Sequence, residues 1–276
     1  MSGAAIVSAM PSISKAFAAT PGAELLSKLV LTMPAMFIAL FSPVAGYIID
    51  HFGRKRLLVS SLVLYAIGGC SGFFMQDLYT ILAGRIILGI AVAGVMTTST
   101  TLIADYFTGE ELNRFLGFQA AFMGFGGILF ISLGGLLTDL AWRAPFLIYL
   151  ISLLLVPMVI KIIYEPKIVE RDDPSSPPPK PDYPRARIMV VYCLAFVGML
   201  TFYNLPVQIP FLLTRLTEIT NTGIGLTISV PIFISSIISL NYKSFKSRFS
   251  FQMIYAIIFA SLAVSFFVIS QASSYL

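Results

Sequence analysis

The chain has 276 residues, of which 57% are hydrophobic and 11% are charged, and its formal net charge is +5. Soluble domains average about 45–50% apolar and about 25% charged residues, so this chain has too few charges to cover a water-facing surface. The composition excludes an ordinary soluble enzyme and a disordered chain, and it predicts several membrane crossings. The 18 Lys and Arg residues are dispersed in short clusters, so we expect the lipid bilayer as a partner and no nucleic acid.

Continuous apolar stretches follow one another along the chain, and each is long enough to form a helix across the bilayer core, which needs about 20 residues. They are 29–49, 57–75, 78–103, 115–138, 144–160, 188–214, 222–242 and 249–275. Transmembrane β-strands are about ten residues long and alternate in polarity. We therefore expect an all-α membrane protein with these eight full helices and a partial first helix.

Basic residues are unequally divided between the two sets of loops. The loops after the first, third, fifth and seventh stretches contain 13 of the 18. The positive-inside rule therefore predicts that the loops after residues 50, 105, 164 and 242 are cytoplasmic. Short loops of this kind are compatible with a plasma membrane, the inner membrane of a bacterial cell.

A Pro-rich, charged segment at 165–187 divides the chain. Such a segment does not pack into lipid and is predicted to be an extended cytoplasmic linker between helical bundles at 1–164 and 188–276. A shift of about 193 residues places 29–49 on 222–242 and 57–75 on 250–268. Parallel repeats of six helices are a transporter architecture, so we expect a fragment of a twelve-helix fold that lacks most of helix 1 and helices 10–12.

The sequence GYIIDHFGRKR, at 46–56, follows the first stretch. It resembles the G-x-x-x-D-[RK]-x-G-R-[RK] loop of the major facilitator superfamily, with His51 as the departure. This resemblance implies that the loop joins helices 2 and 3 and takes part in the conformational switch. We expect the glycines to allow close backbone approach and the acidic side chain to pair with apposed basic residues. The predicted switch residues are Gly46, Asp50, Gly53, Arg54 and Arg56.

Asp105 ends the third stretch, and its surroundings resemble the helix 4–5 loop of the same superfamily. The resemblance implies contact between this carboxylate and the basic loop. We expect an ion pair with Arg54 or Arg56 that holds the cytoplasmic side closed. An ordinary solvated loop charge is the alternative.

Arg85 is the one charged residue inside the apolar stretches. An ionisable side chain in the membrane indicates a functional site by default. The sequence from Arg85 to Gly89 resembles the R-x-x-x-G motif of helix 4, whose arginine is assigned to proton coupling or substrate binding. The alternative is an arginine that reaches out to the membrane surface.

Glycines recur in the fourth stretch, at Gly126, Gly134 and Gly135. They resemble the helix-5 motif of the drug/proton antiporter branch, although Phe130 and Ile131 stand where Gly-Pro is expected. Small residues spaced in this way also serve plain helix packing. In the second half, Tyr203, Asn204 and Gln208 interrupt an apolar run beside prolines and are the candidate cavity residues. The copy of the loop motif at 242–248 lacks its acid and its glycines.

Taken with the resemblance, these features predict a secondary active transporter that works by alternating access. We expect it to export drug-like or hydrophobic compounds and to be coupled to protons. A narrow-specificity metabolite or sugar carrier and an inactive truncated transporter are the alternatives. With one histidine and two separated cysteines, we expect no metal site, no cofactor and no enzyme activity. The expected partners are a small-molecule substrate, protons and the bilayer, with the protein acting as a monomer.

Overall fold

The computed structural model describes residues 3–166, 185–240 and 248–271, with side chains described outside 185–188, 238–240 and 251–252. These residues form helices and contain no strand. Seven helices are long and apolar enough to cross a membrane, and α8 is an additional, shorter apolar helix over its described side chains. The all-α prediction is confirmed. The expected linker at 165–187 and loop motif at 242–248 lie mostly outside the described residues.

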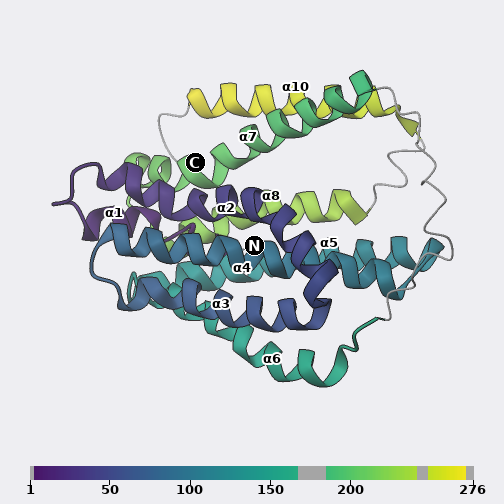
Figure 1. Cartoon of the computed structure of the whole chain (residues 1–276). Coiled ribbons are helices and arrows are strands. Elements are labelled where there is room, and N and C mark those ends of the chain that lie inside the picture. Colours follow the sequence, from purple (N-terminus) through teal and green to yellow (C-terminus); the bar gives the residue numbers. More distant parts are fainter. Residues whose placement is uncertain (1–2, 167–184, 241–247, 272–276) are drawn as a thin grey trace.

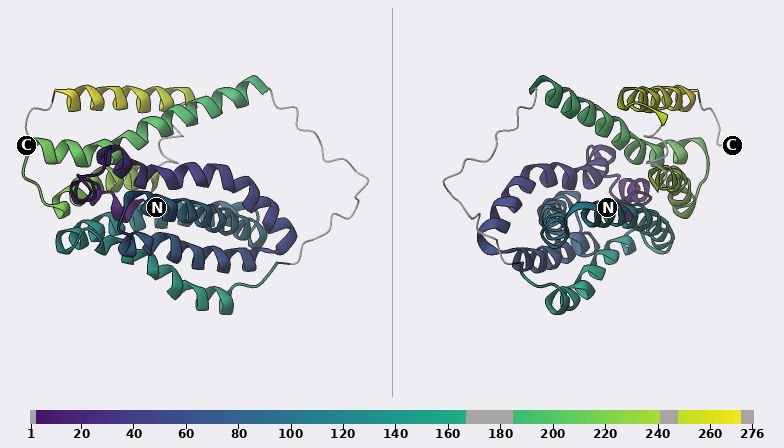
Figure 2. Two further views of the ribbon diagram at one scale, coloured as in Figure 1. Left: turned by 60° about the vertical axis from the view of Figure 1, so that its left-hand side comes forward. Right: turned by 90° about the vertical axis from the view of Figure 1, so that its right-hand side faces the viewer.

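The elements follow the predicted stretches in order. They are η1 (Ala4–Ile6), α1 (Met10–Ala16), α2 (Ala23–Phe52), α3 (Arg54–Phe74), α4 (Leu78–Tyr106), α5 (Gly109–Leu140), η2 (Ala144–Leu150), α6 (Ile151–Ile162), α7 (Arg185–Leu216), α8 (Asn221–Leu240) and α10 (Phe251–Ser270). Figure 1 shows α7 and α10 along one edge of the molecule and α6 along the opposite edge, with α4 and α5 between them. The two turned views in Figure 2 show the same division.

Several helices extend beyond the apolar stretches because charged residues are accommodated in their end turns. In α2, which begins six residues before its predicted stretch, Glu24 and Lys28 form an i,i+4 ion pair of 2.9 Å. The first turn of α5 contains Glu110 and Glu111. Negative charge at the start of a helix interacts favourably with the helix macrodipole. The membrane helices therefore contain charges besides Arg85, and these charges lie near helix ends.

Close backbone contact joins α3 to α4 in the core of the first half. A Cβ added at Gly68 would lie 2.6 Å from the backbone nitrogen of Leu88 and 3.0 Å from the carbonyl oxygen of Gly84. Gly84 in turn faces the hydroxyl of Ser71. Small residues at such crossings allow membrane helices to pack without a hydrophobic driving force. This packing fixes α4, the helix that contains Arg85.

The helix ends define two ends of the bundle. We call the end where α2 stops and α3 starts the Arg54 end. We call the end where α5 stops and α8 starts the Asp139 end. Helices alternate in direction along the chain, so the starts of α2 and α4 also lie at the Asp139 end.

Candidate functional site

The predicted contact between Arg54 and Asp105 is present at the Arg54 end. Arg54 Nε donates to Asp105 Oδ2 at 3.0 Å, and the two side chains are 10% and 26% exposed. The pair joins the first turn of α3 to the last turn of α4, so it lies within the first half of the chain. This low exposure makes the pair stronger than a fully solvated one.

A second carboxylate meets the same loop. Glu165, just after α6, accepts hydrogen bonds from the backbone N–H groups of Arg54 at 2.5 Å and Lys55 at 2.9 Å. The first backbone N–H groups of a helix lack partners within the helix, so Glu165 caps α3. Gly53 has φ +90°, and a Cβ there would lie 2.9 Å from Glu165 Oε1. Glycine at this position thus allows both the turn and the approach of the carboxylate.

Sequence reasoning missed Glu165 because it stands at the start of the expected linker. The available signal was an acidic residue directly after the last helix of the half. A helix start that contains Arg54, Lys55 and Arg56 and lacks a polar side chain at its N-cap has to find an acceptor elsewhere.

The expected pairing of Asp50 with nearby basic residues is not seen among the described residues and stays a prediction. Asp50 is exposed, and the ion pairs found among the described residues do not include it. Arg54 turns to Asp105 instead, and His51 Nδ1 lies 2.9 Å from the carbonyl oxygen of Tyr47 in its own helix. Arg56 is exposed, and a Cβ added at Gly46 would meet nothing within 4 Å. These residues of the loop motif therefore present an uncovered surface within the part of the chain described.

We predict that reversing both charges of the Arg54–Asp105 pair restores function that either reversal removes. Arg54→Asp and Asp105→Arg alone each place like charges at about 3 Å, whereas the double variant restores attraction. Transport is expected to fall in each single variant and to recover in part in the double variant, measured at equal membrane levels. A double variant no better than either single variant would show that the pair itself is not what matters.

Arg85 lies in the interior of the first half. Its residue exposure is 0%. Nη2 donates to the carbonyl oxygen of Gly69 at 2.7 Å. The guanidinium carbon lies 4.7 Å from the ring centroid of Phe146 and 5.1 Å from that of Tyr149, within the range of cation–π contacts. The guanidinium is thus held in an aromatic cage between α3, α4 and η2, and the alternative of a side chain extending to the membrane surface is wrong.

The glycines beside the Arg85 cage are packing positions. A Cβ added at Gly69 would overlap the Tyr149 side chain, and one at Gly72 would overlap the Phe146 ring. Gly89, the glycine of the Arg85 motif, faces Pro34, whose carbonyl oxygen a Cβ would approach to 2.7 Å. These contacts place η2 and α2 directly against the helix pair that contains Arg85.

The three glycines of the predicted α5 motif have different surroundings. Gly134 contacts the backbone of Ala5, and Gly135 lies against the start of α8, where a Cβ would be 2.7 Å from the Asn221 carbonyl oxygen. At Gly126 the nearest atom belongs to Phe130 of the same helix, at 4.0 Å. Two of the three glycines therefore serve helix packing, and the third has room for a side chain.

Asp139 joins the two halves at the end of α5. Its carboxylate accepts hydrogen bonds from the backbone N–H and the amide Nδ2 of Asn221, each at 2.9 Å. It also accepts from the backbone N–H of Thr222 at 2.9 Å and from the Thr222 hydroxyl. Ser12 of α1 donates to Asn221 Oδ1 at 2.9 Å. A carboxylate from the first half thus caps the first helix turn of α8 in the second.

A second charged contact between the halves lies at the same end. Arg215 Nη2, in the last turn of α7, lies 3.2 Å from Glu24 Oε2 of α2. Lys28 forms an ion pair with the same carboxylate. Lys28 Nζ in turn lies 4.9 Å from the ring centroid of Phe211 in α7. Charged and amide contacts between the halves therefore gather at the Asp139 end.

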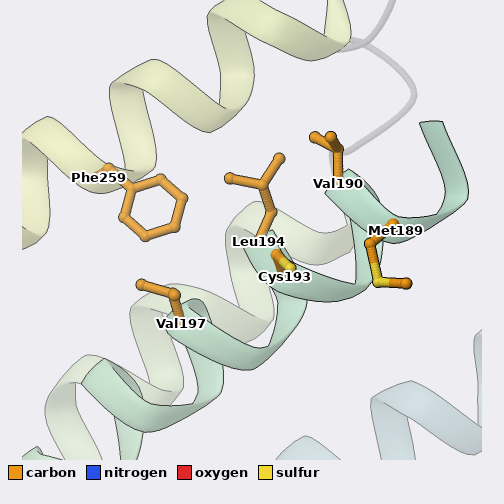
Figure 3. A pocket seen from close by; sticks show the side chains of 6 residues that line it. All are labelled: Met189, Val190, Cys193, Leu194, Val197 and Phe259. Atoms are coloured by element: carbon orange, nitrogen blue, oxygen red, sulfur yellow. The ribbon is translucent and has the colours of Figure 1, made fainter. Parts of the chain in front are cut away.

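The predicted cavity residues of α7 lie on an exposed face. Tyr203, Asn204 and Gln208 are exposed, and Asn204 Nδ2 donates to the Leu200 carbonyl oxygen of its own helix at 3.0 Å. Whether they face a substrate stays a prediction. The pocket shown in Figure 3 is elsewhere, between α7 and α10, and its lining is apolar except for the thiol of Cys193. Cys193 is exposed.

Comparison with protein families decides the identity of this bundle. A family model described as Major Facilitator Superfamily matches residues 1–276. The chain belongs to this superfamily. Within the described residues we find no group of three or more His, Cys, Asp or Glu side chains placed to hold a metal ion.

The names of the curated relatives refer to different compounds. The chain is 34% identical over 125 residues to the bacillibactin exporter of Bacillus subtilis (strain 168), a match covering 43% of the chain and 31% of the relative. It is 33% identical over 124 residues to the class H tetracycline resistance protein of Pasteurella multocida, covering 45% of the chain and 30% of the relative. It is 27% identical over 165 residues to the niacin transporter NiaP of Acinetobacter baylyi (strain ATCC 33305 / BD413 / ADP1), covering 59% and 37%.

A solved superfamily structure confirms the fold. The crystal structure of a D-xylose-proton symporter superposes with a TM-score of 0.66 at 16% identity, covering 88% of this chain and 65% of the other. The matched regions span about a third of the length of the curated relatives. The chain is thus a member of the superfamily by both fold and family model.

Proposed function

We propose that this transporter works by alternating access and exports drug-like or hydrophobic compounds in exchange for protons. Arg85 is the observation that carries the proton-coupling part. Its guanidinium is fully buried and is held by a carbonyl oxygen and two aromatic rings. A buried charge in a membrane helix is energetically costly, so its presence indicates a functional role. A proton or an anionic group that approaches this fixed charge changes its environment strongly, because the surroundings have a low dielectric.

Export is supported by the names of two relatives, an exporter and a resistance protein, which match 43–45% of this chain at 33–34% identity. Hydrophobic substrates are supported by the scarcity of cavity cations, since Arg85 is the one fully buried charged residue among those described. A narrow-specificity metabolite carrier is the second candidate, and the niacin transporter, which matches over a longer stretch of this chain, favours it.

For sidedness we propose that the Arg54 end faces the cytoplasm. The membrane is then the plasma membrane, and the protein is proposed to act in it as a monomer. The 13 of 18 basic residues in the loops at that end support this orientation. Trp142 and Arg143 then lie at the outer surface, where the Arg143 guanidinium carbon stacks 4.7 Å from the Trp142 ring centroid. Aromatic and basic residues of this kind commonly anchor helices at the interface.

Dye accumulation tests the proposal directly. Energised, efflux-deficient cells expressing the complete reading frame are expected to accumulate less ethidium than empty-vector cells, and a protonophore is expected to abolish the difference. Lowered dye that persists with the protonophore would contradict proton coupling. Unchanged dye, with the protein shown to be in the membrane, would contradict drug export and favour the metabolite carrier, which substrate screening in proteoliposomes then identifies.

A further inference from the structure

The two ends of the first half contain the same short pattern of residues. Gly46, Asp50 and Arg54 recur as Gly135, Asp139 and Arg143, each offset by 89 residues. With this offset α2 falls on α5, and the end of α1 falls on the end of α4. Nested three-helix repeats of inverted topology are known in each half of this fold, so one pattern occurs at both ends of the bundle.

The two copies differ in what they contact. Gly135 lies against the Asn221 backbone, and the Asp139 carboxylate accepts four hydrogen bonds from the first two residues of α8. The equivalent Gly46 has nothing within 4 Å of an added Cβ, and Asp50 is exposed. In this conformation the copy at the Asp139 end is engaged with the second half, and no such contact is described for the copy at the Arg54 end.

We propose that Gly135 and Asp139 form an outer latch, which holds the start of α8 when the outer side is closed and releases it when that side opens. The inference rests on the proposed alternating-access function. Glycine allows the α8 backbone to approach, and the carboxylate then satisfies N–H groups that have no partner within α8. Opening at this end exposes these N–H groups and the carboxylate together, so the latch sets the balance between the two states.

Asp77 provides a matched control for Asp139. It lies at the same end and accepts a hydrogen bond from the backbone N–H of Thr80 at 2.9 Å, but it caps α4, a helix of its own half. Asp77 and Asp139 therefore share chemistry and location, and only Asp139 bridges the halves.

The latch is tested by the distance between spin labels across the Asp139 end. Labels are attached at Ala19→Cys, between α1 and α2, and at Glu218→Cys, between α7 and α8, in the Cys70→Ser, Cys193→Ser background of the full chain in nanodiscs. Asp139→Asn is expected to raise the ratio of long to short distances about tenfold, the factor that corresponds to 1.4 kcal/mol. Asp77→Asn and Asp50→Asn are expected not to raise it.

An unchanged ratio in Asp139→Asn, or an equal rise in Asp77→Asn, would overturn the latch. If Asp139→Asn does not fold, Gly135→Ala tests the same contact, because its Cβ would press on the Asn221 carbonyl oxygen. The measurement needs no substrate. A transporter that fails the dye assay yet shows the shift retains the latch, and an active exporter without the shift overturns the latch alone.

Discussion

Arg85→Ala is expected to lower proton-driven dye export about tenfold or more, a loss that corresponds to 1.36 kcal/mol of barrier. The guanidinium is fully buried and is held by the Gly69 carbonyl oxygen and the rings of Phe146 and Tyr149. Alanine removes both the charge and the group that fills the space between these rings. Export is measured as the initial rate of ethidium efflux at equal protein levels in the membrane.

Two further variants separate the charge of Arg85 from its shape. Arg85→Lys keeps the charge but loses the planar group that stacks on aromatic rings, so we expect an intermediate rate. Arg114→Ala is the matched control, since Arg114 also stacks on an aromatic ring, 5.4 Å from the Phe118 centroid, but is exposed. Export by Arg85→Ala at the wild-type rate would show that the buried guanidinium has no part in transport.

Gly72→Ala is expected to destabilise the protein although alanine is the better helix former. A Cβ at position 72 would overlap the Phe146 ring, so η2 has to move away from α3. Overpacking of this kind costs about 1–3 kcal/mol. With about 2–4 °C per kcal/mol for a chain of this size class, the midpoint of thermal unfolding in detergent is expected to fall by about 2–12 °C.

Gly117→Ala is the matched control for Gly72→Ala. Gly117 lies within α5, and an added Cβ would meet nothing within 4 Å. Alanine there gains helix propensity without a clash, so the midpoint is expected to stay or rise slightly. Equal midpoints for the two variants would contradict the packing of η2 on α3 and, with it, the Phe146 side of the Arg85 cage.

The helices were predictable because each depends on local composition alone. An apolar stretch of about 20 residues has few alternatives to a helix in a bilayer. The ends were less predictable, since Glu24 and Lys28 interrupt the apolar pattern while forming a pair within α2. A hydropathy profile places the end of the helix at such charges, although the backbone stays helical on both sides of them.

The site was predictable where a motif fixes both partners and was missed where only folding brings them together. The Arg54–Asp105 pair was expected from the resemblance of two loops. By contrast, Glu165 and Arg54 are separated by 111 residues, and Asp139 and Asn221 by 82. For Asp50 the motif suggested pairing with neighbouring basic residues, and one of these, Arg54, pairs with Asp105 of α4 instead.

The cap that Glu165 provides for α3 has a consequence for biogenesis. The backbone N–H groups of Arg54 and Lys55 are synthesised 111 and 110 residues before their acceptor. At about 5–20 residues per second, the ribosome takes roughly 5–20 seconds to add that length. During this interval α3 to α6 enter the bilayer while the start of α3 relies on water or lipid headgroups. The first half of the chain therefore completes this junction only when its last helix has been made.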